Sequence, residues 1–315
     1  MAPSAITETV ASVLPVMKKT EAPEGKGQVV ALEKTPLEAI SHGIVMPGIP
    51  IFPSFVEERK HTLVHMAATF RFFHRCGFTE GMSGHISVRD PEHQGLIWMN
   101  PLGRHFGLIT AGDMICLEIE TGRIVGGNLT RPANSAGYLI HSAVHKRRPH
   151  DVHAVCHAHT NAGRAWSVFA RPLEMLSQDI CNFHNAHAVY ARYGGIVFGD
   201  EEGQAIADSL GEHNKGAILM NHGLITVGET VDEAGFMFGL LDRGCQMQLQ
   251  VEAAAAAGIK KNIISDEEAS YNFKMASEKN ALYREAQPDL EYEFEMAGGE
   301  EVVARGFEAL SPLKL

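Results

Sequence analysis

The middle of this chain mixes short apolar segments with longer amphipathic ones, in an order that limits the folds open to it. Short runs rich in branched and aromatic residues are typical of strands, and the candidates are residues 85–89, 95–99, 114–118, 152–157, 196–198 and 217–220. Apolar residues spaced by three and four predict helices, which are expected over residues 55–76, 137–148, 203–210, 231–257 and 266–285. This order is not the βαβαβ series of a Rossmann sheet. We therefore expect a layered α/β or α+β domain with substantial antiparallel pairing.

The two ends of the chain differ from this middle part. Residues 1–52 are predicted to form an extended arm, because prolines interrupt them too often for a long helix. The layered domain is expected over residues 53–258. Residues 259–315 predict one last helix, over 266–285, followed by a polar and acidic tail from Pro288 onward.

Composition and charge narrow the classes of protein to consider. The 315 residues include 38 Asp and Glu against 27 Lys and Arg, a net charge of -11. Binding to nucleic acid is not expected, because neutralising phosphates needs clustered basic residues. The absence of any apolar run of about 18 residues argues against a membrane span, and the first residues do not read as a signal peptide. Five cysteines without a CxxC pair fit a reducing compartment, so a cytoplasmic protein is expected.

Seventeen histidines make metal binding the first function to consider, because histidine is the commonest metal ligand in proteins. His157 and His159 end an apolar strand candidate. Residues two apart on a strand project to the same face, so both imidazoles can reach one ion at about 2.0–2.1 Å. About one such pair is expected by chance in this composition. The position at the end of a strand therefore supports the prediction more than the pair itself does.

A third histidine, His222, lies between two apolar segments and directly before Gly223. A glycine permits positive φ and a sharp turn that would push the histidine out of the sheet. Three histidines from separate strands would make a site with open coordination positions, as in catalytic metal centres. A turn histidine without a ligand is the alternative.

Other segments have weaker signals. The glycines of residues 81–87 (GMSGHIS) could present backbone amides to an oxyanion, although an ordinary tight turn is the alternative favoured there. The i,i+4 pairs His61/His65 and His141/His145 lack the glutamate of an HExxH motif. They are predicted to lie on solvated or half-buried helix faces.

Taken together, these segments resemble the class II aldolase/adducin family. The similar region runs from about Leu63 to Leu249, and its pieces follow in the family's order: GMSGHISVR (81–89), NPLG (100–103), LITAGDMICLE (108–118), RRPHDVHAVCHAHT (147–160) and NHG (221–223). The resemblance implies a three-layer α/β/α domain with a largely antiparallel central sheet. It also implies a homo-oligomer, usually a tetramer, with active sites near the subunit interfaces.

The resemblance further implies a divalent metal held by His157, His159 and His222. Zinc is the first expectation, with Fe(II), Mn and Co as alternatives. A Lewis-acidic ion would stabilise an enediolate, the carbanion equivalent that C–C cleavage leaves. Aldol cleavage and decarboxylation both pass through this type of intermediate.

The sequence departs from the sugar-phosphate aldolases of this family in ways that resemble its adducin-like branch. Gly137 stands where those aldolases have an acid/base glutamate, and His85 stands where they have a phosphate-binding asparagine. Leu102 and Ala136 replace hydroxyl residues of the phosphate pocket. The branch includes metal-dependent decarboxylases of aromatic or oxo acids, iron oxygenases and non-catalytic cytoskeletal proteins.

The sequence therefore favours a metal-dependent lyase that makes or breaks a C–C bond in a non-phosphorylated hydroxy- or oxo-carboxylic acid. The expected catalytic residues are His85, Gln178 and Tyr193, and the expected substrate-binding residues are Gly84, Asn100, Gly103 and Ser135. An Fe(II) oxygenase with the same three histidines is one alternative. A non-catalytic, adducin-like interaction protein is another, supported by the proline-rich arm and the acidic tail.

Overall fold

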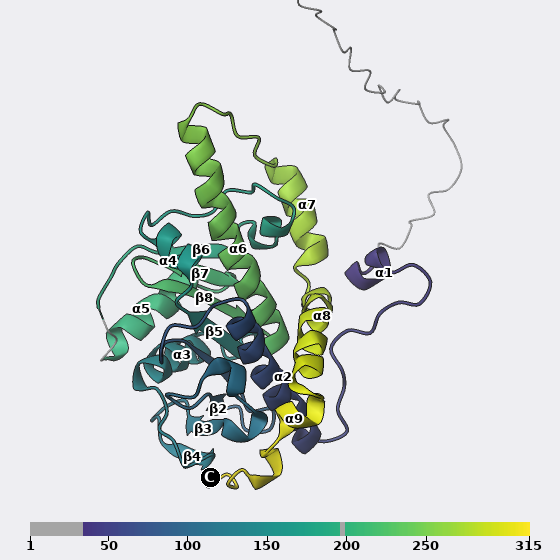
Figure 1. Ribbon diagram of the computed structural model, residues 1–315, viewed down its shortest axis with the longest axis vertical. Helices are drawn as coiled ribbons and strands as arrows, with labels where there is room; N and C mark the ends of the chain where they lie inside the picture. The colour runs from purple at the N-terminus through teal and green to yellow at the C-terminus, as the bar shows by residue number, and fades with distance from the viewer. Residues whose placement is uncertain (1–33, 196–198) are drawn as a thin grey trace, which may run out of the picture. The chain divides into compact units, whose positions relative to one another are not determined.

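A mixed β-sheet forms the centre of the computed structural model, which describes residues 34–195 and 199–315 (Figure 1). Within these residues the sheet has eight strands in the order β4-β3-β2-β1-β5-β8-β7-β6, and only β6 and β7 pair in parallel. Their bounds are β1 His85–Arg89, β2 Leu96–Met99, β3 Ile115–Glu118, β4 Ile124–Gly127, β5 Ala154–Ala158, β6 His187–Tyr190, β7 Gly216–Leu219 and β8 Gly223–Gly228. The expected antiparallel pairing is confirmed. The strand candidate at 196–198 and the arm before residue 34 lie outside the described residues.

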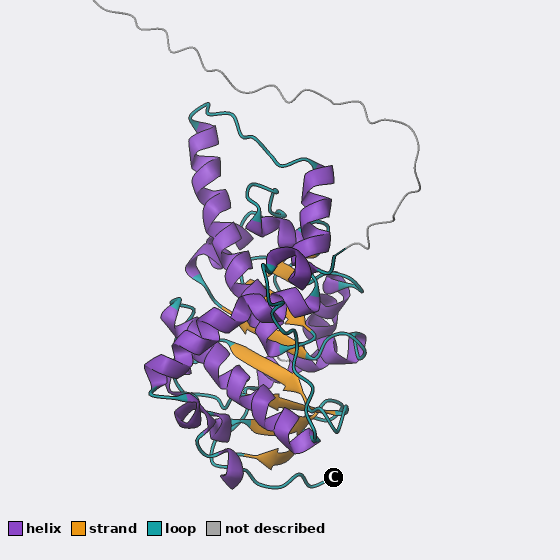
Figure 2. Cartoon of the chain, turned by 90° about the vertical axis from the view of Figure 1, so that its right-hand side faces the viewer, coloured by secondary structure: helices purple, strands orange, loops and turns teal. Residues whose placement is uncertain are grey.

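Helices cover both faces of the sheet (Figure 2). One face packs against α2 (Phe55–Arg75), α4 (Asn161–Ser167), α6 (Val231–Ala256) and α8 (Lys279–Ala297), and the other against α3 (Ser135–Arg147) and α5 (Asp200–Leu210). Neighbouring residues on β5 show why: Cys156 lies in the core with α2 and α6, whereas Val155 lies in the core with α3 and α5. Because side chains alternate across a strand, an apolar strand needs a cover on each side. The expected three-layer α/β/α architecture is confirmed.

The C-terminal part differs from the single helix and polar tail expected from the sequence. It contains α7 (Asp266–Ala276), then α8, which continues through Pro288, and α9 (Glu300–Ala304). A proline inside a helix removes one hydrogen bond and is unfavourable by about 3 kcal/mol. Burial of Leu282 and Leu290 in the main core offsets this penalty. Tertiary packing therefore decides the length of α8.

The remaining described elements are short. Helix α1 (Pro36–Ile40) begins with a capping box between Thr35 and Glu38. The chain after it reaches α8, where the Ile49 amide donates to Asn280 Oδ1 at 3.0 Å. Among the described residues, no helix is both long and apolar enough to cross a membrane.

A buried ion pair attaches β1 to α2. Arg59 donates from Nε to Asp90 Oδ2 at 2.6 Å and from Nη2 to Oδ1 at 2.9 Å. Trp98 of β2 donates to the same carboxylate at 2.8 Å. Burial would raise the pKa of Asp90, but the hydrogen bonds from Arg59, Trp98 and the His93 amide outweigh it and hold the pKa below its usual value. The carboxylate directly after β1 is therefore charged and fully bonded, and it anchors the strand that starts with His85.

We predict that Asp90→Asn lowers the free energy of unfolding at pH 7 by about 3 kcal/mol, because it removes the buried carboxylate that Arg59 binds through two hydrogen bonds and leaves the arginine paired with the exposed Glu92. Since the folded-state pKa of Asp90 lies below the unfolded value of about 3.9, its contribution is complete above roughly pH 5 and fades as the pH falls through 4. Urea unfolding of both proteins between pH 7 and pH 3 measures the difference. Glu92→Gln is the control, because Glu92 bonds the same arginine from the surface and should change stability by less than about 1 kcal/mol. A wild-type advantage that persists undiminished at pH 3 would contradict the prediction.

Candidate functional site

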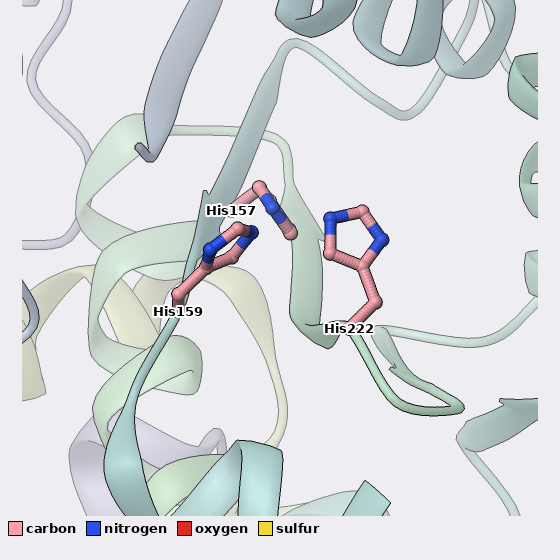
Figure 3. A group of neighbouring side chains, drawn as sticks. All are labelled: His157, His159 and His222. Carbon is pink, nitrogen blue, oxygen red and sulfur yellow. The ribbon is translucent and has the colours of Figure 1, made fainter. Parts of the chain in front are cut away.

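Three histidines converge where two neighbouring strands meet (Figure 3). His157 lies on β5, His159 is the first residue after this strand, and His222 lies in the turn between β7 and β8. One nitrogen from each ring lies within 4.8 Å of the other two. The rings come together because β5 pairs with β8, with His157 opposite Ile225. The expected grouping of these three side chains is therefore present.

The turn that holds His222 differs in detail from the expectation. Asn221 has the positive φ, 55°, that was expected of Gly223. Gly223 is required for another reason: a Cβ there would lie 2.9 Å from the carbonyl oxygen of Ala158 on the neighbouring strand. Asparagine tolerates the left-handed region. Asn221 therefore supplies the backbone conformation of the tight turn, and Gly223 allows the turn to lie close to β5.

The protonation of the three rings suits a metal ligand. His157 donates from Nδ1 to the Leu224 carbonyl at 2.8 Å, which leaves Nε2 with a lone pair. Burial, with the neighbouring imidazoles, lowers the pKa of His157 well below its usual value and that of His222 to about 4. Burial, and then the charge of Arg164, also lowers the pKa of His159. Because three neutral imidazoles are a donor set that zinc, iron and copper accept, the residues present fit a divalent transition metal.

A cavity of about 510 Å³ opens over these histidines. Its further lining residues come from the segment before β1, the loop after β2, the start of α3 and the loop after β6, and include Gly84, His85, Leu102, Ala136, Ile140 and Tyr193. Of the residues predicted from the sequence, Gly84, His85 and Tyr193 therefore share one cavity with the three histidines. A volume of this size holds a small organic molecule.

The other four predicted residues do not line this cavity. Gln178 lies beside α7, where its backbone carbonyl accepts from Asn272 at 3.1 Å. Asn100 is buried and accepts from the Ile86 amide at 3.3 Å, so it joins β2 to β1. Gly103 occupies a turn with φ of +76°, and Ser135 is exposed at the first position of α3. Their neighbours Leu102, Asn134 and Ala136 face the cavity instead.

The part of the chain that carries this site matches a known family profile. Residues 64–249, more than half of the chain, match the profile described as "Class II Aldolase and Adducin N-terminal domain". The chain belongs to the class II aldolase/adducin family. Among solved structures, L-fuculose 1-phosphate aldolase from Glaciozyma antarctica PI12 is similar, with a TM-score of 0.71, 36% identity, and coverage of 79% of this chain and 95% of that one.

Three proteins of similar sequence have names that point to different functions. "Meiotically up-regulated gene 14 protein" of Schizosaccharomyces pombe is 38% identical over 80% of this chain and 96% of its own length. "4-Hydroxy-3-prenylphenylpyruvate oxygenase/4-hydroxy-3-prenylbenzoate synthase" of Streptomyces roseochromogenus subsp. oscitans is 43% identical over 66% of this chain and 74% of its own length. "Decarboxylase NovR" of Streptomyces niveus is 43% identical over 65% of this chain and 75% of its own length.

The positively charged residue of the cavity was not predicted from the sequence. Arg164, on α4, lines the cavity and donates from Nη2 to Glu80 at 2.9 Å and to Asn161 at 3.0 Å. It is the one lysine or arginine on the described lining. Its position could have been found: Thr160 is an N-cap residue directly after His159, and Arg164 is the fourth residue of the short helix that Thr160 starts.

His85 and Gly137 fit together sterically. The His85 ring stacks on His157 with centroids 4.8 Å apart. A Cβ on Gly137, in the first turn of α3, would lie 2.6 Å from His85 Cδ2 and 2.8 Å from Cγ. Real Cβ atoms do not approach other atoms so closely. The imidazole at 85 therefore requires that residue 137 has no side chain.

We predict that Gly137→Ala destabilises the protein when His85 is present and no longer does so when the imidazole is removed. Alanine normally stabilises a helix by about 1 kcal/mol relative to glycine, but with His85 present the overpacking should destabilise the protein by about 1–3 kcal/mol. In a His85→Ala background the same substitution should be neutral or stabilising. Denaturant unfolding of the wild type, both single variants and the double variant measures this coupling. Additive effects would refute the steric link; Gly95→Ala is the control, because a Cβ added at Gly95 would have nothing within 4 Å.

Proposed function

We propose that the protein is a divalent-metal-dependent lyase that makes or breaks a C–C bond in a non-phosphorylated hydroxy- or oxo-carboxylic acid, by retro-aldol cleavage or decarboxylation. The observation that carries this proposal is the convergence of His157, His159 and His222 on one cavity of about 510 Å³. A divalent ion held by these imidazoles would act as a Lewis acid toward a substrate oxygen. The similarity to a structure named as an aldolase and to a relative named as a decarboxylase supports the reaction class.

The lining of the cavity supports the substrate class. Arg164 can bind a carboxylate through a charge-assisted hydrogen bond. Leu102 and Ala136 offer no hydroxyl to a phosphate group on the described lining. His85 and Tyr193 supply polar groups on the same cavity and would serve as acid/base groups. We propose that His85, whose ring lies against Gly137, takes over the acid/base role of the glutamate that sugar-phosphate aldolases of the family have at that helix position.

Zinc is the metal that we propose, with Fe(II), Mn and Co as alternatives, in a cytoplasmic homotetramer. An Fe(II)-dependent oxygenase is the second candidate function. It is favoured by the name of the relative that is 43% identical, which includes an oxygenase activity. Three imidazoles with open positions also suit iron chemistry.

We predict stoichiometric divalent metal in the purified full-length protein and its loss in His157→Ala. The reason is that His157 supplies the buried ligand of the three, and its replacement leaves only two imidazoles. Elemental analysis of both proteins, after dialysis against metal-free buffer, measures the content. His150→Ala, at an exposed histidine outside the cavity, should keep the metal. A wild type without metal would refute both enzyme functions and favour a non-catalytic, adducin-like role.

With the metal in place, turnover of a panel of hydroxy and oxo acids under air and under nitrogen separates the two enzyme functions. The proposed lyase should release the same product at the same rate in both atmospheres. Turnover that stops without dioxygen would replace the lyase with the oxygenase.

We predict that Arg164→Gln raises KM for the carboxylic acid substrate by roughly tenfold to a hundredfold with a smaller effect on kcat. A charge-assisted hydrogen bond contributes about 1.5–3 kcal/mol to binding, and each 1.4 kcal/mol is a factor of ten. Steady-state kinetics on the acid that the panel identifies gives both constants. Arg171→Gln removes an exposed arginine outside the cavity and should change neither constant. An unchanged KM in Arg164→Gln would remove this residue from the substrate site.

A further inference from the structure

A chain of hydrogen bonds leads from the cavity into the interior of the protein. His85 Nδ1 lies 2.8 Å from His141 Nε2, His141 Nδ1 lies 2.7 Å from Ser87 Oγ, and Ser87 Oγ lies 2.8 Å from His145 Nε2. His141, Ser87 and His145 are all buried. The sequence predicted that His141 and His145 lie on a solvated or half-buried helix face, so their complete burial is a correction. We call these four residues the histidine relay.

Two different periodicities bring the histidine relay together. His85 and Ser87 are two residues apart on β1 and therefore project to the same face of the sheet. His141 and His145 are four residues apart on α3 and therefore project to the same face of the helix. Because α3 covers this face of β1, the hydroxyl of Ser87 lies between the two helix imidazoles.

A backbone carbonyl at the inner end gives the histidine relay its direction. His145 Nδ1 lies 3.3 Å from the Val152 carbonyl, which can only accept a hydrogen bond. Val152 is fully buried, and its carbonyl has no other backbone or side-chain donor among residues 34–195 and 199–315. The Arg89 Nη2 group has two hydrogens: one is donated to the His145 carbonyl at 2.8 Å, and the other points toward His145 Nδ1 across 3.4 Å, a longer distance than that to Val152. The buried Val152 carbonyl would be left without a donor if Nδ1 accepted from Arg89, whereas Arg89 Nη2 keeps its bond to the His145 carbonyl in either case. His145 Nδ1 therefore carries the proton that satisfies Val152.

The remaining proton positions follow in sequence, because a neutral imidazole has one donor and one acceptor nitrogen. His145 Nε2 accepts from the Ser87 hydroxyl. Ser87 Oγ accepts from His141 Nδ1, and His141 Nε2 accepts from His85 Nδ1. Burial keeps the pKa values of His141 and His145 well below their usual value, in agreement with neutral rings. The last nitrogen, His85 Nε2, is left with a lone pair.

We propose that Ser87, His141 and His145 are positioning residues that fix His85 in its Nδ1–H tautomer, so that Nε2 is a hydrogen-bond acceptor on the ring that lines the cavity. This inference deepens the proposed function and rests on it for its consequence in catalysis. An acceptor at this position can bind a substrate hydroxyl, whereas it repels a carboxylate. Together with Arg164, it favours a hydroxy acid as the substrate, with the carboxylate on the arginine and the hydroxyl on His85.

The test is the tautomer of His85 in the full-length, metal-free protein. Two-bond ¹H–¹⁵N correlation spectra of ¹⁵N-histidine-labelled protein, after treatment with EDTA, distinguish Nδ1–H from Nε2–H rings. His85→Gln identifies the His85 signals by their disappearance. We expect a single Nδ1–H tautomer for His85 in the wild type and its loss in Ser87→Ala, which breaks the histidine relay. Ser87→Thr keeps the hydroxyl and should keep the tautomer.

Ser142→Ala is the matched control. It removes a buried hydroxyl from the same helix that donates to the Leu139 carbonyl and takes no part in the histidine relay, so the His85 signals should not change. An Nε2–H tautomer in the wild type, or an unchanged Nδ1–H tautomer in Ser87→Ala, would overturn the proposal. If Ser87→Ala does not fold, Ser87→Cys replaces the hydroxyl with a weak thiol donor of similar shape, and the same two outcomes apply. Because this experiment uses neither metal nor substrate, its failure is distinct from a failure of the lyase proposal, which the metal content decides.

Discussion

The position of β5 between β1 and β8 is the constraint on which the rest of the site depends. Antiparallel pairing places His85 directly opposite His157 on one side and Ile225 opposite it on the other. Opposed residues in an antiparallel pair share a face of the sheet. A register slip of one residue would send His157 to the other face. The apolar neighbours of His157 oppose such a slip, because Val155 and Cys156 each belong to a different core.

The chemistry of the site is arranged in two parts on this frame. The three clustered histidines lie at the strand ends, where their rings reach the cavity. Behind them, the histidine relay is enclosed between β1 and α3. The two parts meet where His85 stacks on His157. Gly137 links them sterically, because any side chain there would displace His85. A substitution at Gly137 or at His85 is therefore expected to alter the packing at the other position.

Several elements were predictable because their signals are local. The strand over 85–89 and the helices over 55–76 and 231–257 agree with β1, α2 and α6 to within a residue, because each is strongly apolar at one period. The strands β4 and β6 were missed although β2, β3 and β7 are equally short, because the segment IVGG ends in two glycines and HAVY begins with a histidine and an alanine, and glycine and alanine are depleted in strands. The length of α8 was missed because Pro288 predicts an end that packing overrides. Gln178 was expected near the metal histidines, yet it lies beside α7.

The sequence by itself determined the family and the three histidines that cluster, because His157 and His159 are two apart on one strand and the NHG turn follows a recognisable order of motifs. Only the tertiary structure decided what surrounds them. Arg164 on α4 lines the cavity, and His141 is buried in contact with Ser87. Gly137 has no side chain that would collide with the imidazole of His85, which comes from a strand distant in the sequence. These contacts join segments whose spacing in the chain has no period, so no local pattern can encode them. They exist because antiparallel pairing and the cover of α3 bring distant side chains to one place.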